Sequence, residues 1–324
     1  MLLVLVLAAC SSSGETETGK DSGASGAESN GKKLVIGFSQ VGAESEFRTA
    51  NTKSIQEAVK AAGHELKFSD AQQKQENQIK AIRSFIAQKV DAIILAPVVE
   101  TGFETVLKEA KDAGIPVFLS DRAVDIEDDS LWVSFLGSDF IEEGQKAAQW
   151  TLDEYKDHDG DINIVELQGT VGSAPAIDRK NGYEEILADH PNFKIIKSQS
   201  GDFTRAKGKE VMEAFLKSDG KNIDLLFAHN DDMAIGAIQA IEEYGLIPGK
   251  DIKVIGMDAV RGAFEAMAAG KMNVTIECNP MIGPQLVELI EAHAAGETLE
   301  KRVVVEEGMY TMDQAAELLP TREY

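Results

Sequence analysis

Acidic and basic side chains directly follow several short apolar runs of this sequence, at places where parallel strands would end. The run 115–119 leads into Asp121 and Arg122, and a similar run ends at Asp258. A carboxylate only accepts hydrogen bonds and a guanidinium only donates them, so together they suit a ligand with neighbouring hydroxyl groups. In open α/β sheets, ligands bind just beyond the carboxyl ends of the strands, which is where these residues are expected.

Other predicted strands lead into polar or aromatic residues in the same way. Asp and Asn at such positions also favour helix starts, so for any single residue helix capping and ligand contact are equally good interpretations. For Asp121 and Asp258 together, at equivalent strand ends in two halves of the chain, ligand contact is favoured. The whole set of candidates consists of Ser39, Glu44, Phe47, Arg48, Asp121, Arg122, Thr170, Arg179, Phe203, Asn230 and Asp258.

The chemistry that this set favours is recognition of an uncharged polyol. Hydrogen bonds to charged groups contribute roughly 1.5–3 kcal/mol each. Rings such as Phe47 and Phe203 could cover the apolar C–H faces of a sugar. The mixture of Asp and Arg keeps the net charge of the site near zero, whereas a phosphate or carboxylate ligand would call for more Lys and Arg.

Signatures of catalysis or cofactor binding are missing from the sequence. No G-x-G-x-x-G or G-x-x-x-x-G-K-[ST] follows a predicted strand, and there is no G-x-S-x-G. The five histidines are scattered without ligand spacing, and the segment 157–168 lacks the glycine and the closing glutamate of a calcium loop. We therefore expect no enzyme activity, no cofactor and no bound metal.

The elements that must position these residues are short apolar runs that alternate with amphipathic stretches. Such alternation is typical of βαβ units and predicts parallel sheets covered by helices on both faces. It starts again after Gly137. Residues 91–97 can be laid on 224–230, each followed by a helix, a glycine stop and a strand that ends in aspartate. With 324 residues, more than one ordinary core, the sequence predicts an α/β fold of two similar three-layer lobes.

The amino-terminal segment has a different character. Residues 1–10 are apolar, too short to cross a bilayer, and end in Leu-Ala-Ala-Cys10, so they indicate an export signal peptide. That ending resembles the lipobox of bacterial lipoproteins, in which the cysteine becomes the lipid-carrying amino terminus. Residues 11–32 contain no large apolar residue and predict a flexible linker. We expect the folded part to lie outside the cytoplasm, anchored to the membrane by a lipid on Cys10.

The charge and the cysteine content argue against a nucleic-acid partner and against a disulfide. The formal net charge of −23 argues against a nucleic-acid partner, because phosphate binding draws on an excess of Lys and Arg. Cys10 and Cys278 are the only cysteines, and no intrachain disulfide is expected between them. Cys278 is interpreted as a small buried hydrophobic residue.

Longer stretches of the chain resemble the substrate-binding proteins of bacterial sugar ABC transporters, of the ribose/galactose type within the type I periplasmic binding proteins. The resemblance covers nearly all of the chain from about Lys33 and is strongest to the members that bind galactofuranose. It is carried by residues 36–42, 70–78, 96–99, 165–171, 176–180, 198–205 and 228–233.

The resemblance implies a monomer whose two Rossmann-like lobes, joined by a three-segment hinge, close on one monosaccharide and deliver it to an ABC permease. The implied N-terminal lobe comprises 33–137 and 280–304, and the C-terminal lobe 138–279 and 305–324. Family contacts carry over onto Phe47, Arg48, Asp121, Arg122, Arg179, Phe203, Asn230 and Asp258, and a hinge-side polar residue onto Asn279. Phe47 stands where the family leads us to expect tryptophan. The stretch 277–281 is one residue shorter than in the family members that bind galactofuranose.

Three other functions are considered beside transport. A sugar sensor for a chemoreceptor would use the same binding site. A repressor-like DNA-binding regulator would need a basic helix-turn-helix ahead of the first strand, where this chain is acidic. A secreted sugar-converting enzyme would turn over a candidate sugar on incubation.

Overall fold

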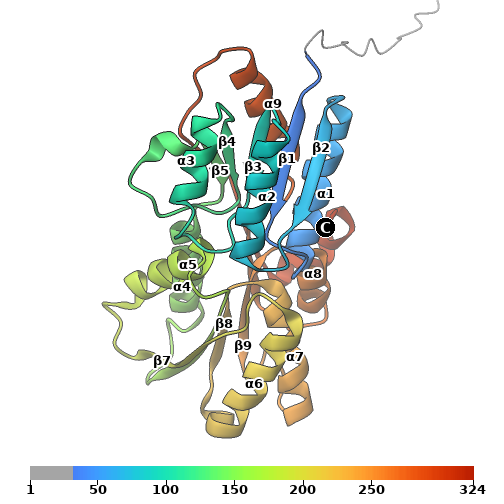
Figure 1. Ribbon diagram of the computed structural model, residues 1–324. Coiled ribbons are helices and arrows are strands. Elements are labelled where there is room, and N and C mark those ends of the chain that lie inside the picture. Colours follow the sequence, from blue (N-terminus) through green and yellow to red (C-terminus); the bar gives the residue numbers. More distant parts are fainter. Residues whose placement is uncertain (1–31) are drawn as a thin grey trace, which may run out of the picture. The chain divides into compact units, whose positions relative to one another are not determined.

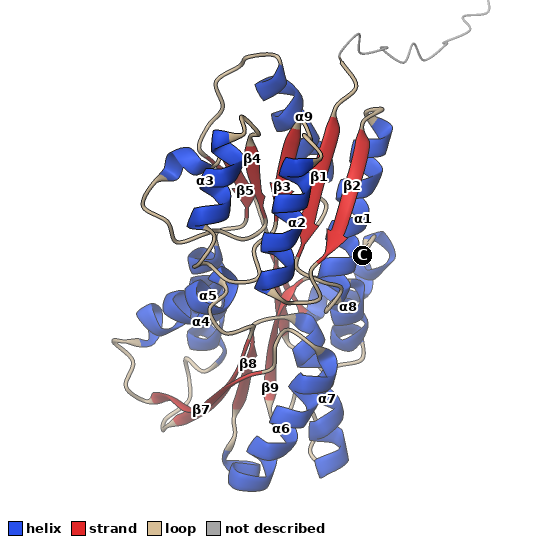
Figure 2. Cartoon of the chain, viewed as in Figure 1, coloured by secondary structure: helices blue, strands red, loops and turns tan. Residues whose placement is uncertain are grey.

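The computed structural model describes residues 32–324. The predicted signal peptide, Cys10 and nearly all of the predicted linker lie outside these residues. Each apolar strand run of the sequence becomes a strand in one of two six-stranded sheets, and amphipathic helices cover both faces of each sheet (Figure 1, Figure 2). Among the described residues, no helix is both long enough and apolar enough to cross a membrane.

Lobe 1 is built around the first sheet, whose strand order is β11-β5-β4-β3-β1-β2 and whose pairs are all parallel. Its helices α1 and α9 pack on one face, and α2 and α3 on the other. The strands are β1 (Val35–Gln40), β2 (Glu65–Asp70), β3 (Ala92–Leu95), β4 (Val117–Ser120), β5 (Ser134–Gly137) and β11 (Arg302–Val304). The helices are α1 (Glu46–Ala61), α2 (Gln75–Ala87), α3 (Glu104–Asp112) and α9 (Gly283–Ala294).

Lobe 2 repeats this plan, with the strand order β12-β10-β9-β8-β6-β7. All its pairs are parallel except β10 with β12. Helices α4 and α5 pack on one face, and α6, α7, α8 and α10 on the other. The strands are β6 (Ile162–Gln168), β7 (Phe193–Ser200), β8 (Leu225–Ala228), β9 (Lys253–Asp258), β10 (Val274–Glu277) and β12 (Met309–Thr311). The helices are α4 (Phe140–Glu154), α5 (Ala174–Leu187), α6 (Arg205–Asp219), α7 (Asp231–Tyr244), α8 (Arg261–Ala268) and α10 (Ala315–Leu318).

The internal repeat seen in the sequence has a structural counterpart. Strands β3 and β8 hold the same place in their sheets. Asp91, just before β3, accepts a hydrogen bond from the N–H of Val35 at 2.8 Å. Asp224, just before β8, accepts one from Asn163 at 2.7 Å. In both lobes an aspartate therefore ties the start of a central strand to its neighbour.

The chain passes between the two sheets three times, through 138–139, 278–282 and 305–308, which we call the first, second and third crossings. After β11 the chain forms two further named elements of lobe 2, β12 and α10. The apolar run 115–119 of the sequence begins two residues before the strand that it contains. In the structure β4 begins at Val117, because Pro116 has no N–H to donate to the ladder.

Candidate functional site

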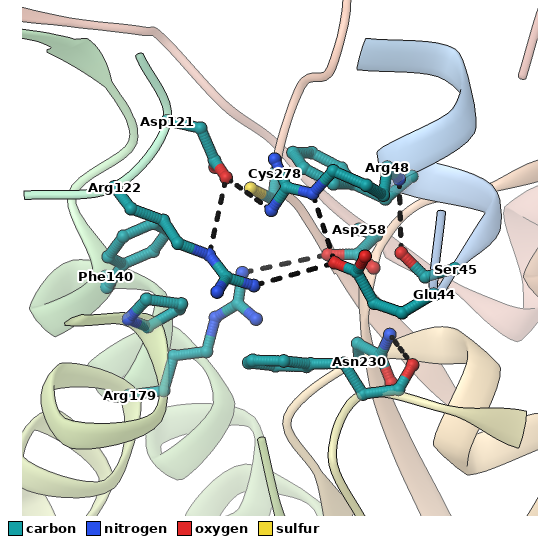
Figure 3. Close-up of a pocket in the computed structure, with 13 residues that line it drawn as sticks. Glu44, Ser45, Arg48, Asp121, Arg122, Phe140, Arg179, Asn230, Asp258 and Cys278 are labelled. Atoms are coloured by element: carbon teal, nitrogen blue, oxygen red, sulfur yellow. Dashed lines mark hydrogen bonds and ion pairs between the residues drawn. The ribbon is translucent and has the colours of Figure 1, made fainter. Parts of the chain in front are cut away.

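A cavity lies between the carboxyl ends of the two sheets and draws its walls from both lobes (Figure 3). Strand ends and helix starts supply nearly all of these walls, because both sheets point their carboxyl ends toward the cavity. It is lined by Glu44, Ser45, Phe47, Arg48, Asp121, Arg122, Phe140, Pro175, Arg179, Phe203, Asn230, Asp258 and Cys278.

Arg48 organises the lobe 1 side of the cavity. Its Nη2 lies 2.6 Å from Oδ2 of Asp121, its Nε lies 3.1 Å from Oε1 of Glu44, and its Nη1 donates to Gln40 at 3.3 Å. The Ser45 hydroxyl caps α1 by accepting from the N–H of Arg48 at 3.1 Å, which fixes the turn from which the side chain leaves. Burial lowers the pKa of Arg48, but the two carboxylates outweigh it and raise the pKa above its ordinary value.

Arg122 is held much more loosely than Arg48. Its nearest carboxylate oxygens are 3.7 Å away on Asp121 and 3.8 Å away on Glu44, and its Nε has no hydrogen-bond partner among the described residues. Burial, followed by the like charge of Arg48, lowers the pKa of Arg122 to about 10. Its guanidinium carbon stands 5.2 Å from the ring centre of Phe203, so an arginine of lobe 1 faces an aromatic ring of lobe 2.

Arg179 organises the lobe 2 side. Its Nε donates to Glu143 at 2.6 Å, its Nη1 donates to the carbonyl of His229, and its guanidinium carbon stands 5.1 Å from the ring centre of Phe140. Its Nη2 reaches only to 3.7 Å from Oδ1 of Asp258 (Figure 3). Burial raises the pKa of Asp258 well above its usual range, although Arg179 opposes the shift.

Asp121 and Asp258 share an unusual backbone conformation. Their φ angles are 65° and 107°, in the region that non-glycine residues rarely adopt, and Asp is among the residues that tolerate it best. Asp121 is further held by a hydrogen bond from its N–H to Leu136 at 2.8 Å. A Cβ on Gly137 would lie 2.6 Å from the Asp121 carbonyl, so glycine is needed there to admit this backbone. Two equivalent strand ends are thus bent to aim a carboxylate.

Phe203 and Asn230 form one wall together. The Asn230 side chain caps α7 by accepting from the N–H of Met233 at 3.0 Å, and its amide donates to the Phe203 carbonyl at 3.2 Å. A Cβ on Gly169 would lie 1.9 Å from the Phe203 ring, so glycine makes room for this ring. At Asn230 the capping interpretation is therefore observed, and the residue lines the cavity as well.

The structure brings nine of the twelve predicted ligand-binding residues to this cavity, namely Glu44, Phe47, Arg48, Asp121, Arg122, Arg179, Phe203, Asn230 and Asp258. Ser39, Thr170 and Asn279 do not line it. Ser39 lies within β1 rather than after it, and the hydroxyls of Ser39 and Thr170 are buried without a hydrogen-bond partner. The Asn279 side chain accepts from the N–H of Met281 at 2.9 Å, within the second crossing.

Four cavity residues were not predicted: Ser45, Phe140, Pro175 and Cys278. Ser45 and Pro175 stand at the starts of α1 and α5, where a capping or helix-starting role explains them fully. Phe140 directly follows the first crossing, and Cys278 is the first residue of the second. Knowing where the chain changes lobes would have pointed to both.

Glu143, Cys278 and Glu307 place one polar atom each within 4.8 Å of one another, behind Arg179. One Glu143 oxygen is already paired with Arg179. Burial raises the pKa of the Cys278 thiol well above its usual range, so it is not a thiolate. We therefore assign no metal to this group.

The lobes also contact each other outside the cavity. Arg205 of α6 lies 2.7 Å from Glu46 of α1 and 2.8 Å from Asp232 of α7, and the N–H of Glu46 donates to Asp232 at 2.7 Å. We call these three residues the Arg205 bridge. Gln73 of lobe 1 also donates to the carbonyl of Asp202 in lobe 2 at 3.2 Å. The lobes are therefore closed against each other in this structure.

Comparison with known proteins gives consistent results. Residues 36–298 match the family described as periplasmic binding protein domain. The chain is 51% identical over 293 residues to the galactofuranose-binding protein YtfQ of Escherichia coli (strain K12), covering 90% of this chain and 92% of that protein.

Two solved structures superpose on most of the chain. One, from Mycobacterium smegmatis in complex with β-D-fucofuranose, has a TM-score of 0.88 and 54% identity, and the match covers 90% of this chain and 95% of that chain. The other is the periplasmic binding protein component of the arabinose ABC transporter from Shewanella sp. ANA-3, bound to α- and β-L-arabinofuranose. It has a TM-score of 0.86 and 50% identity, with 89% and 95% covered. These superpositions confirm the predicted fold class.

Proposed function

Because this chain belongs to the periplasmic binding protein family, and there to the sugar-binding proteins of ABC transporters, we propose that it captures a monosaccharide in its furanose form between the two lobes. The family consists of solute-binding proteins and not of enzymes. The fold is that of the type I periplasmic binding proteins. Galactofuranose is the ligand that we propose first.

The observation that carries this proposal is the balance of charge in the closed cavity. On the lobe 1 side, Glu44 and Asp121 face Arg48 and Arg122, so two negative charges meet two positive ones. An uncharged ligand with many hydroxyl groups can satisfy such mixed donors and acceptors without leaving a buried charge unpaired.

Furanose specificity is supported by the relatives. The Escherichia coli protein is named for galactofuranose, and the two solved structures hold fucofuranose and arabinofuranose. These three sugars share a five-membered ring and differ in what it carries. We infer that the arginine and aspartate set recognises the ring hydroxyls. Phe47 and Phe203, both buried beside the cavity, would cover its C–H faces.

Closure follows from the two-sided site. A sugar that contacts both lobes binds the closed arrangement better than the open one, and so shifts the population toward it. We propose 33–137 with 280–304 and 138–279 with 305–324 as the two moving bodies, joined by the three crossings. We also propose that the protein works as a monomer outside the cytoplasm, anchored by lipid on Cys10, and hands its sugar to an ABC permease.

The test is a calorimetric and thermal-shift screen of the protein with galactofuranose, L-arabinose, D-fucose and D-ribose, beside methyl galactopyranoside, whose ring cannot become a furanose. A ligand at 100 times its Kd stabilises the native state by about 2.7 kcal/mol. We expect galactofuranose to raise the midpoint clearly and the locked pyranoside to leave it unchanged. A shift with the pyranoside alone would remove the furanose assignment, and no shift with any sugar would remove the proposal.

A variant pair locates the binding in the cavity. Arg122→Met should abolish the shift, because Arg122 faces the cavity without a strong partner. Arg83→Met is the matched control, since Arg83 pairs with Glu109 on the exposed surface of lobe 1. Equal affinities of the two variants would place the sugar elsewhere.

A further inference from the structure

One carboxyl group ties together the three segments that join the lobes. Glu307 lies in the third crossing, and its Oε1 accepts from the Ser138 hydroxyl at 2.6 Å and from the N–H of Asn279 at 2.7 Å. Ser138 belongs to the first crossing and Asn279 to the second. The Ser138 hydroxyl also lies 3.3 Å from the Cys278 sulfur. Ser138, Asn279 and Glu307 belong to the segments at which the chain must turn when the lobes move, so we expect opening to loosen this cluster.

Glu307 meets a second carboxyl group, Glu143 of α4, whose side chain is 1% exposed. One Glu143 oxygen accepts from Arg179 at 2.6 Å, and the other has no partner among the hydrogen-bond donors of the described residues. The two carboxyl groups have oxygens within 4.8 Å of each other, and one group is fully buried while the other is half-buried, so each disfavours the ionised form of the other. A proton shared between them removes this repulsion. The orphaned Glu143 oxygen is the acceptor that such a proton requires.

We propose that Glu143 and Glu307 share one proton when the lobes are closed, and that this proton positions Arg179 for the sugar and is released when the lobes open. The inference rests on the proposed function, because sugar binding is what closes the lobes. Glu307 is a positioning residue in this scheme. It acts through Glu143, which fixes the Arg179 guanidinium beside Asp258.

The electrostatic surroundings agree with a shared proton. Burial, followed by the charge of Glu143, raises the pKa of Glu307 to about 9. Burial also raises the pKa of Glu143, although Arg179 opposes that shift. Lys146 donates to the Glu307 carbonyl at 3.1 Å and not to its carboxyl group. The titratable and charged groups near the pair are Arg179, Cys278, Asp121, Asp258, Lys146, Arg302, Asp139 and Glu142.

The pH dependence of sugar affinity follows from the difference between the pKa of Glu307 in the closed and in the open protein. The pKa of Glu307 is raised in the closed protein. In the open protein, where water reaches the pair, we expect the ordinary carboxyl pKa of about 4.3. The closed state then holds a proton that the open state has lost, so closure is favoured at low pH. Sugar affinity should be full near pH 4.3 and fall as the pH rises toward 9.

The experiment is sugar titration by calorimetry at pH 7, repeated in buffers of different ionisation enthalpy, with the sugar that the screen identifies. The wild-type protein should take up close to one proton per sugar, and its affinity should fall by up to tenfold per pH unit. Glu307→Gln keeps a donor toward Glu143, so it should bind well, take up no proton and lose the pH dependence. Glu317→Gln, at an exposed position of α10 in lobe 2, is the matched control and should behave as wild type.

The outcomes separate this inference from the proposed function. Absence of binding heat with every sugar removes the proposed function. Binding without proton uptake by the wild-type protein overturns the shared proton alone, and that measurement needs no variant to fold. Proton uptake that persists unchanged in Glu307→Gln would also overturn it.

Discussion

The lobe 1 side and the lobe 2 side of the cavity hold their charged groups in place with different residues. In lobe 1, Arg48 is held by close ion pairs, whereas Arg122 stays 3.7 Å or more from any carboxylate oxygen. In lobe 2, Arg179 is held by Glu143 at 2.6 Å, and Asp258 stays 3.7 Å from it. Each side thus has one arginine fixed in place and one charged group left with a weak partner, a donor in lobe 1 and an acceptor in lobe 2.

This difference separates two tasks within one set of residues. Buried charges with short, well-directed partners set the shape of the site, because losing a partner leaves the other charge uncompensated. Weakly partnered groups lose little when they turn to a ligand, so they are the ones available for sugar hydroxyls. We expect Arg122 and Asp258 to carry affinity, and Arg48 and Arg179 to carry structure.

The largest effect should come from breaking a close pair. Arg48→Ala leaves Asp121 and Glu44 buried without their main partner, so the free energy of unfolding should fall by about 3–5 kcal/mol. Arg122→Ala should cost clearly less, because its ion pairs are long. Urea unfolding of both variants without sugar makes the measurement. Equal losses of stability would erase the distinction between the two arginines.

The next effect concerns the acceptor in lobe 2. Asp258→Asn keeps the size and the tolerance for a positive φ but replaces one carboxyl oxygen by an amide that only donates, so it should weaken sugar binding by roughly 10–100-fold, equivalent to about 1.5–3 kcal/mol. Calorimetry gives the affinity, with exposed Asp153→Asn in lobe 2 as the charge-matched control. If Asp258→Asn bound as tightly as the control, Asp258 would not contact the sugar.

The smallest effect should come from the Arg205 bridge, which joins the lobes without lining the cavity. Arg205 and Glu46 are about two-fifths exposed, and pairs of this kind contribute roughly 0.2–1 kcal/mol. Arg205→Ala should therefore weaken binding by at most about fivefold, mainly through faster sugar release, and less so at high salt. Lys207→Ala on the same helix is the control. An unchanged release rate would show that the bridge does not hold the lobes closed.

The site residues that the sequence predicted best are those at the ends of strands. Asp121 and Asp258 follow apolar runs, and the topology of parallel sheets is enough to bring such residues to one edge. Ser39 was assigned to the site for the same reason, but it lies inside β1, one residue before the strand ends. A shift of one residue reverses the side on which a strand side chain points.

What the sequence could not predict lies at the crossings. Cys278 and Phe140 reach the cavity only because the chain changes lobes next to them, and no local pattern marks such a change. Glu143 was missed for a related reason. It sits on the first turn of α4 like any acidic helix-start residue, and only the packing of α4 on α5 brings it to Arg179. These contacts depend on tertiary structure.

Cys278 is the only cysteine of residues 32–324, and it is 1% exposed where the cavity meets the second crossing. A buried thiol reacts with a labelling reagent only in molecules whose lobes have separated. The rate of its alkylation then reports the fraction of time that the protein spends open. A sugar that lowers this alkylation rate would measure closure of the lobes without any attached probe.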